Sequence, residues 1–214
     1  ALEDISKNKS PNVVTMINTI KPYGRWEKIC GKGRILPAFP GAGGCIEGGI
    51  LDAQLLPRAI QPTTFGEIGG RKSSREEALA YIFRKSHIPY QIVPEMHHWQ
   101  ISHLGVIIPL ADAYYQSRHP EKICANEKLM TLTAYRMKKN LKWIAQKGML
   151  CPAKLYMIKD MPTGMLAGVL SRVYQSEFGN RFLYRHAMHA PQEFQRLHQE
   201  FYNYMKTCLL YTSP

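Results

Sequence analysis

The feature that most constrains the fold of this chain is a change in hydrophobic periodicity close to Pro94. Before this residue, short β-branched and apolar runs alternate with turn residues, as in buried strands. After it, apolar residues recur at helical spacing and strand-type runs disappear. Proline also disfavours helix for the residue before it, so no helix is expected to run across this point. We therefore predict an α/β part over residues 1–93, followed by an all-α part over residues 94–207.

In the first part, the sequence pattern predicts strands that alternate with short helices. Helical segments are expected at 2–9, at 22–31 and from Ser73 onward, where a hydroxyl precedes two glutamates as in a helix N-terminus. Strands are expected at 12–17, 34–39, 49–56, 62–66 and 90–93. The order strand, helix, strand within residues 12–39 favours parallel neighbours, because parallel strands need a crossover connection.

In the second part, the sequence pattern predicts helices alone, at 95–117, 121–147, 163–178 and 191–206. Pro109 lies inside the first of these and is expected to kink it, because the ring removes a backbone donor. Gly148 is expected to end the second helix with a positive φ, and Pro152 prevents its continuation.

Composition indicates a soluble globular protein, since 45% of the 214 residues are hydrophobic and 21% are charged. No apolar run approaches the roughly 20 residues that span a bilayer, and the first residues lack the pattern of a signal peptide. We therefore expect a cytoplasmic protein with no membrane partner. The five cysteines are widely spaced without a C-x-x-C pair, which favours reduced thiols over disulfides or zinc.

The formal net charge of +12 favours anionic ligands or partners. The basic residues are scattered along the sequence, without a cluster interleaved with aromatic residues as nucleic-acid binding needs. A nucleic-acid partner is therefore not expected, and it stays a third alternative supported by net charge alone.

A glycine-rich run, Phe39–Ile50, is the most conspicuous local motif. It lacks the Lys and Ser/Thr of a P-loop and leads toward a strand instead of a helix, so a tight connection between strands is expected at Gly41–Gly49. No G-x-G-x-x-G occurs anywhere in the chain, so the sequence contains no phosphate-binding turn of a dinucleotide fold.

Three stretches in this order, Phe39–Ile50, Thr63–Glu67 and Trp99–His103, resemble the ketopantoate reductase (2-dehydropantoate 2-reductase) family. The resemblance runs over residues 2–205. It implies the distal part of a Rossmann-type cofactor domain at 1–93, then an α-helical substrate and dimerisation domain at 94–207 of the 6-phosphogluconate dehydrogenase C-terminal-like kind. It also implies NADP as cofactor, a 2-keto acid or similar small carbonyl compound as substrate, and a homodimer formed through the helical domain.

The family's phosphate-binding turn lies upstream of the region that Leu2 resembles. We therefore expect the chain to be an N-terminally truncated fragment that is inactive by itself. The last residues, 208–214, resemble a translated transposon end of sequencing libraries and are expected to be a non-native tail.

Asn18 is the candidate cofactor-binding residue. It follows the predicted strand ending at Ile17, and the carboxyl ends of parallel strands are where open α/β sheets bind ligands. The resemblance implies that it contacts the nicotinamide half of the cofactor and the substrate. The alternative is an asparagine that only forms the turn before Pro22.

His103 and Glu177 are the candidate catalytic residues. The family lysine that protonates the keto oxygen corresponds to Ile101, and two family asparagines correspond to Gly105 and Pro109. His103 lies one turn after Trp99, and a histidine can donate a proton near neutral pH. The alternative is a histidine that only packs or caps.

Glu177 is matched to a substrate-contacting glutamate of the family through Pro162–Leu166, with a slip of one residue. No metal site is expected: His186, His189 and Glu193 have suggestive spacing, but Pro191 interrupts the helix that would present them. The missing lysine leaves two alternatives, an NADPH-dependent reductase or a non-enzymatic binding or regulatory protein on the same scaffold.

Overall fold

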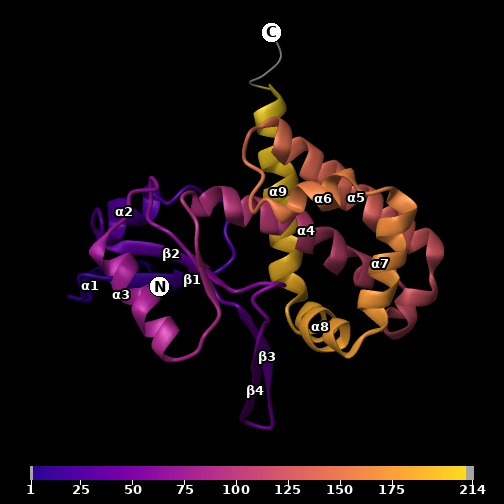
Figure 1. Cartoon of the computed structure of the whole chain (residues 1–214), viewed down its shortest axis with the longest axis horizontal. Helices are drawn as coiled ribbons and strands as arrows, with labels where there is room; N and C mark the ends of the chain where they lie inside the picture. Colours follow the sequence, from indigo (N-terminus) through magenta and orange to yellow (C-terminus); the bar gives the residue numbers. More distant parts are fainter. Residues whose placement is uncertain (1, 211–214) are drawn as a thin grey trace. The chain divides into compact units, whose positions relative to one another are not determined.

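The computed structural model describes residues 2–210, apart from the side chains of Cys45, Glu47 and residues 208–210. The chain divides into two compact units, and Figure 1 colours it by residue number. Unit 1 comprises Ala1–Gly43 and Asp52–His97, and unit 2 comprises Gly44–Leu51 and His98–Pro214. The expected non-native tail at 208–214 lies outside the residues whose side chains are described.

Unit 1 contains a four-stranded sheet in the order β1-β2-β5-β6. Its strands are β1 (Val13–Met16), β2 (Ile35–Phe39), β5 (Thr63–Phe65) and β6 (Tyr90–Ile92). β1 pairs with β2 and β5 with β6 in parallel, as predicted for a partial Rossmann-type sheet. β2 and β5 are antiparallel, so the sheet is mixed and not parallel throughout.

The antiparallel pair has a local cause in the hairpin of β3 (Ala42–Glu47) and β4 (Ile50–Leu55). The amide of Leu56 donates to the carbonyl of Gly41 at 2.8 Å, which closes the base of this hairpin. The chain therefore returns to the edge of the sheet at which β2 ends. β5 starts at that edge and has to run in the opposite direction to β2.

The hairpin also corrects the interpretation of the glycine-rich run. Most of Gly41–Gly49, expected to be a connection, is itself strand β3, whereas the expected strand at 49–56 is confirmed as β4. The turn consists of Gly48 and Gly49, with φ of 56° and 81°. Two successive positive φ values define the tight turn that suits the twist of a hairpin, and glycine adopts them without steric cost.

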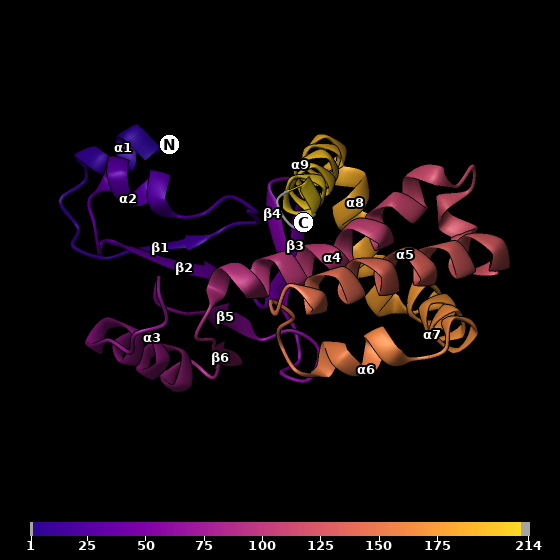
Figure 2. The ribbon, with the colours of Figure 1, turned by 90° about the horizontal axis from the view of Figure 1, so that it is seen from above.

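Helices cover both faces of the sheet, as Figure 2 shows: α1 (Leu2–Lys7) and α2 (Gly24–Cys30) on one side, α3 (Ser74–Lys85) on the other. The alternation of side chains along β2 explains this arrangement. Ile35 packs against Trp26 of α2, whereas Leu36, the next residue, packs against Phe83 of α3. β2 is thereby buried on both faces, as is usual for a strand with a parallel neighbour.

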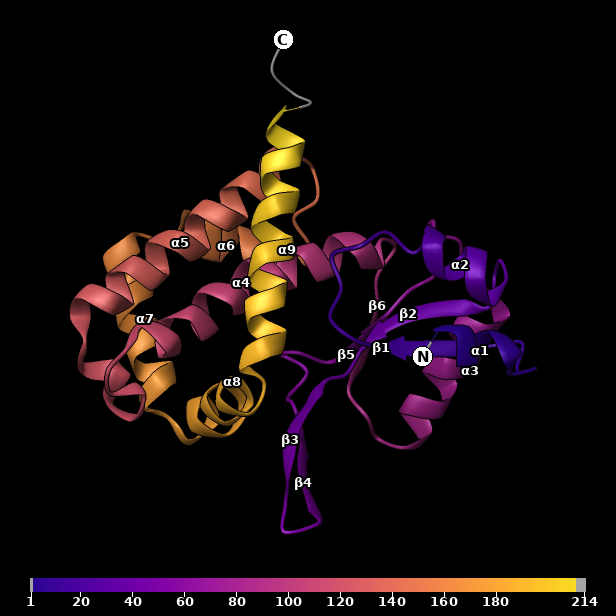
Figure 3. The ribbon, with the colours of Figure 1, turned by 180° about the vertical axis from the view of Figure 1, so that it is seen from behind.

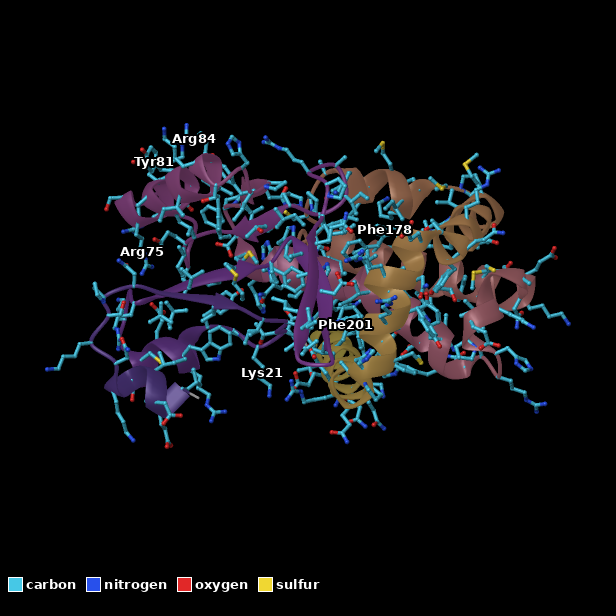
Figure 4. All side chains as sticks on the ribbon, turned by 90° about the horizontal axis from the view of Figure 1, so that it is seen from below. Lys21, Arg75, Tyr81, Arg84, Phe178 and Phe201 are labelled. Atoms are coloured by element: carbon cyan, nitrogen blue, oxygen red, sulfur yellow. The ribbon has the colours of Figure 1, made fainter. Side chains whose placement is uncertain are left out.

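The predicted start of α3 is confirmed, because the Ser73 hydroxyl accepts a hydrogen bond from the amide of Glu76 at 3.2 Å. Arg75, labelled in Figure 4, anchors the same helix to the sheet. Its guanidinium donates to the carbonyl of Ile35 at 3.1 Å and binds both oxygens of Glu67. The Arg75 hydrogen bond is the main cause that lowers the pKa of Glu67.

Apart from Gly44–Leu51 of the hairpin, unit 2 is helical, and residues 98–210 as described contain no strand. Its elements are α4 (Met96–Gln116, which begins two residues earlier), η1 (Pro120–Ala125), α5 (Glu127–Gln146), α6 (Lys154–Asp160), α7 (Thr163–Gln175), η2 (Gly179–Tyr184), α8 (Arg185–His189) and α9 (Pro191–Leu210). Helices predicted at 95–117, 163–178 and 191–206 are confirmed. The single helix predicted at 121–147 is instead η1 and α5, separated at Asn126, whose side chain caps α5 through the amide of Leu129 at 3.1 Å.

The predicted end of α5 is confirmed at Gly148, which has a φ of 69°. The short elements α6, η2 and α8 were missed, because each spans five to seven residues and gives little periodic signal. No helix within residues 2–210 is both long and apolar enough to cross a membrane.

α4 is the central element of unit 2, and α9 crosses it in Figures 1 and 3. Ile101 and Leu104 are 0% exposed, and Phe201 of α9 is equally buried. α5 approaches α4 closely at Gly105, where an added Cβ would lie 2.7 Å from Cδ1 of Ile144. A side chain at position 105 would therefore force the end of Ile144 to move.

Candidate functional site

Asn18 lies at the edge of the sheet where the parallel strands β1 and β2 both end. The loop that carries it is held in place: the Thr19 hydroxyl accepts from the amide of Lys21 at 3.1 Å, and the carbonyl of Ile20 contacts Nε2 of His97 at 2.8 Å. Asn18 itself is half-buried and makes no side-chain hydrogen bond to any residue in 2–210. The neighbouring residues of the loop are thus held in place, and the hydrogen-bonding groups of the Asn18 amide have no partner among residues 2–210.

The groups at this edge can be compared with those that the two halves of a dinucleotide need. A side-chain amide suits the carboxamide of nicotinamide, because each group has both a donor and an acceptor. Residues 2–210 show no glycine-rich turn leading from a strand into a helix, the element that binds pyrophosphate. Among the described residues, Asn18 therefore offers groups that could pair with a carboxamide, and the glycine-rich turn for phosphates is not present.

His103 lies on α4 in unit 2, stacked on Trp99 with ring centroids 5.0 Å apart and an interplanar angle of 9°. Burial lowers the pKa of His103 to about 3, and the neighbouring His186 contributes to the shift. At neutral pH the imidazole is uncharged. It can donate an N–H hydrogen bond, as neutral histidines do to developing oxyanions, whereas the lowered pKa disfavours the imidazolium form at neutral pH. The catalytic role of His103 stays a prediction.

His186, on α8, is exposed at the surface yet packs edge-on against Phe194 with ring centroids 5.2 Å apart, and partial desolvation lowers its pKa too. His189 contacts the carbonyl of Arg185 through Nδ1 at 2.7 Å. Among the residues that the structure describes, no group of three or more His, Cys, Asp or Glu side chains is arranged to hold a metal ion.

The remaining predicted residues are not joined to His103. Glu177 is exposed between α7 and η2, and its side chain makes no hydrogen bond or ion pair within residues 2–210. Ile101, at the position of the family lysine, is 0% exposed inside the core of unit 2. Asn18 belongs to unit 1 and both predicted catalytic residues to unit 2.

The structure reveals a pair that the sequence interpretation missed, Asp112 on α4 and His198 on α9. Nδ1 of His198 lies 3.0 and 2.9 Å from the two carboxylate oxygens of Asp112. The Asp112 side chain is 14% exposed and that of His198 is 42% exposed. One sequence signal was available, since Asp112 is the only carboxylate in the mainly apolar α4, and a carboxylate on such a helix needs a partner.

Two further side chains lie beside this pair. Burial raises the pKa of Asp112, against the opposing effects of His198 and of Arg136 on α5. The ring of Tyr202 is 4.7 Å from that of His198, and its hydroxyl also interacts electrostatically with Arg136. The Asp112 carboxylate, the His198 imidazole and the Tyr202 phenol thus lie together, and the Arg136 guanidinium on α5 acts on them electrostatically.

Comparison with known proteins gives limited further information. No protein family model matches the sequence, and no curated protein matches it. Among solved structures, the chain is similar to 2-dehydropantoate 2-reductase from Porphyromonas gingivalis W83, with 13% sequence identity and a TM-score of 0.45. The match covers 90% of this chain and 64% of that reductase, so the chain spans less than two thirds of its length.

Proposed function

We propose that this chain belongs to an NADPH-dependent oxidoreductase that reduces a 2-keto acid or a similar carbonyl compound. Asn18 in unit 1 contacts the nicotinamide half of the cofactor, and the helical unit 2 binds the substrate and forms the homodimer. The observation that carries the proposal is the Asn18 amide, which has no partner among residues 2–210 and lies in an anchored loop at the carboxyl edge of β1 and β2. The reduced nicotinamide supplies hydride when it is bound.

A second candidate is a non-enzymatic binding or regulatory protein on the same scaffold. Two observations favour it: Ile101 is buried at the position of the family lysine, and the pKa of His103 is about 3. Neither residue supplies a proton at neutral pH. A reductase therefore requires a different proton donor in this chain.

NADPH titration, followed by the fluorescence of the nicotinamide, tests the first candidate. We expect saturable but weak binding, because residues 2–210 provide no pyrophosphate element. Asn18→Ala is expected to weaken binding roughly tenfold, the effect of one or two lost hydrogen bonds. Asn12→Ala is the matched control, because Asn12 precedes the opposite end of the same strand and is exposed.

Equal binding by both variants would contradict the assigned role of Asn18. NADPH consumption with a panel of 2-keto acids then separates the two candidates. Substrate-dependent consumption supports the reductase, whereas NADPH binding without consumption of any carbonyl compound supports the binding protein.

A further inference from the structure

Reduction of a 2-keto acid makes two demands on the protein that neither His103 nor Ile101 meets. The substrate carboxylate needs a cationic partner, and the keto oxygen needs a proton as the carbon is reduced. We propose that Asp112, His198 and Arg136 meet both demands in unit 2: Arg136 binds the carboxylate, and His198, held by Asp112, exchanges the proton with the keto oxygen. The inference rests on the proposed function for its substrate class.

The hydrogen bonds to Asp112 determine which nitrogen of His198 is available. Both carboxylate oxygens lie within 3.0 Å of Nδ1, so Nδ1 carries a proton directed at the carboxylate. Nε2 is then the nitrogen that gains and loses a proton. No residue in 2–210 hydrogen-bonds to Nε2, and the 42% exposure of the side chain leaves it open to a ligand and to solvent.

Arg136 provides the positive charge. It interacts with Asp112 and with the Tyr202 hydroxyl, yet it forms no ion pair with any described residue, although it is half-buried. A guanidinium presents two parallel N–H donors that match the oxygens of a carboxylate. A small carboxylate is therefore the ligand that the unpaired Arg136 fits best.

The proton and electron balance is complete with NADPH as the reductant. A bound NADPH would supply the hydride, with its two electrons, to the keto carbon, and Nε2 of His198 would supply the proton to the keto oxygen. The product is a 2-hydroxy acid, and neutral His198 regains its proton from solvent. Asp112 keeps its negative charge and stabilises the imidazolium, so it is a positioning residue.

The competing interpretation is that Asp112 and His198 only fasten α9 to α4. Nuclear magnetic resonance of the ¹⁵N-labelled chain separates the two, with pyruvate as the probe. We expect pyruvate to shift the ring nitrogen signals of His198 saturably and to leave those of His189 unchanged. A merely structural pair would show no saturable shift, and this result alone would overturn the proposal.

Matched variants assign the role of Arg136. Arg136→Gln is expected to weaken pyruvate binding roughly 10- to 100-fold, the effect of a lost charge-assisted hydrogen bond. Lys139→Gln removes the same charge from an exposed position of α5 and is expected to change the affinity less than twofold. Equal effects of both variants would show that net charge, and no specific contact with Arg136, attracts pyruvate.

If the protein reduces a 2-keto acid, the steady-state kinetics of variants test the roles of His198 and Asp112. His198→Gln is expected to lower kcat about 100-fold or more with little change in KM, and Asp112→Asn to displace the pH profile, with partial rescue in Asp112→Glu. Unchanged kcat and pH profiles would overturn the catalytic assignment while leaving the reductase function intact. Pyruvate binding without NADPH binding would contradict the reductase function and leave the carboxylate-binding role of Arg136 intact. Thermal unfolding confirms that each variant is folded.

Discussion

The side-chain amide of Asn140 on α5 donates a hydrogen bond to the backbone carbonyl of Gly105 on α4 at 3.2 Å. In an α-helix the amide of residue 109 would donate a hydrogen bond to this carbonyl, but Pro109 has no N–H. Asn140 is 2% exposed and replaces the missing donor from a neighbouring helix. Gly105 and Pro109, which depart from the family pattern, are thus parts of one packing arrangement in this protein.

This relationship predicts that the loss of stability in one variant can be partly reversed by a second substitution. Asn140→Ala leaves a buried carbonyl without a donor and is expected to lower the free energy of unfolding by about 1–3 kcal/mol. Adding Pro109→Ala restores the backbone donor, so the double variant is expected to recover part of the loss. Urea unfolding measures both values, and Asn203→Ala, at an exposed position of α9, is the control. A double variant less stable than the sum of the single effects would contradict the explanation.

The pKa of His103 predicts how stability depends on pH. The folded-state pKa is about 3 and the ordinary value is 6.5, so the unfolded chain binds more protons between these pH values. His103 therefore adds stability above pH 6.5 that is lost as the pH falls toward 3, by up to about 1.4 kcal/mol per pH unit. Urea unfolding at several pH values measures the slope.

His103→Gln is expected to flatten that slope, because glutamine does not titrate. His189→Gln is the matched control, since this exposed residue contacts only the carbonyl of Arg185 among the described residues. If both variants kept the wild-type slope, the buried neutral state of His103 would be refuted.

Ile101→Lys tests whether the family lysine can be restored at this position. Because Ile101 is 0% exposed, the substitution places an ammonium group in the core of unit 2, which is expected to cost several kcal/mol. We expect thermal unfolding at a lower temperature and no gain in ketopantoate reduction. Gln116→Lys, at the exposed end of the same helix, is expected to have little effect. A stable variant with new ketopantoate turnover would show that position 101 faces a substrate.

Gly66→Ala tests the edge of unit 1 where β5 ends. An added Cβ would lie 2.0 Å from the carbonyl oxygen of Val93, a backbone atom that cannot move without disturbing the pairing of β5 with β6. We expect a loss of at least about 1–3 kcal/mol, as for overpacked cores. At Gly24 an added Cβ meets no atom within 4 Å, so Gly24→Ala is the control and is expected to be neutral or slightly stabilising. Equal stability of the two variants would contradict the close approach.

Local chemistry made much of this fold predictable. Ser73 followed by glutamates specified the start of α3, Gly148 the end of α5, and the change of periodicity near Pro94 the passage from strands to helices. Each of these signals acts within a few residues, through a cap, a positive φ or a repeat of apolar side chains. Asn18 at the end of β1 follows from the same kind of reasoning.

Contacts between residues far apart in the sequence decided the rest. The antiparallel pairing of β5 depends on the hairpin that returns the chain, and the pKa of His103 depends on burial beside α8. Asp112 and His198 are 86 residues apart, and no local pattern connects them. The sequence by itself determined where helices and strands form, because those choices are local. Only the tertiary structure determined which polar side chains meet, because burial and distance are properties of the folded chain.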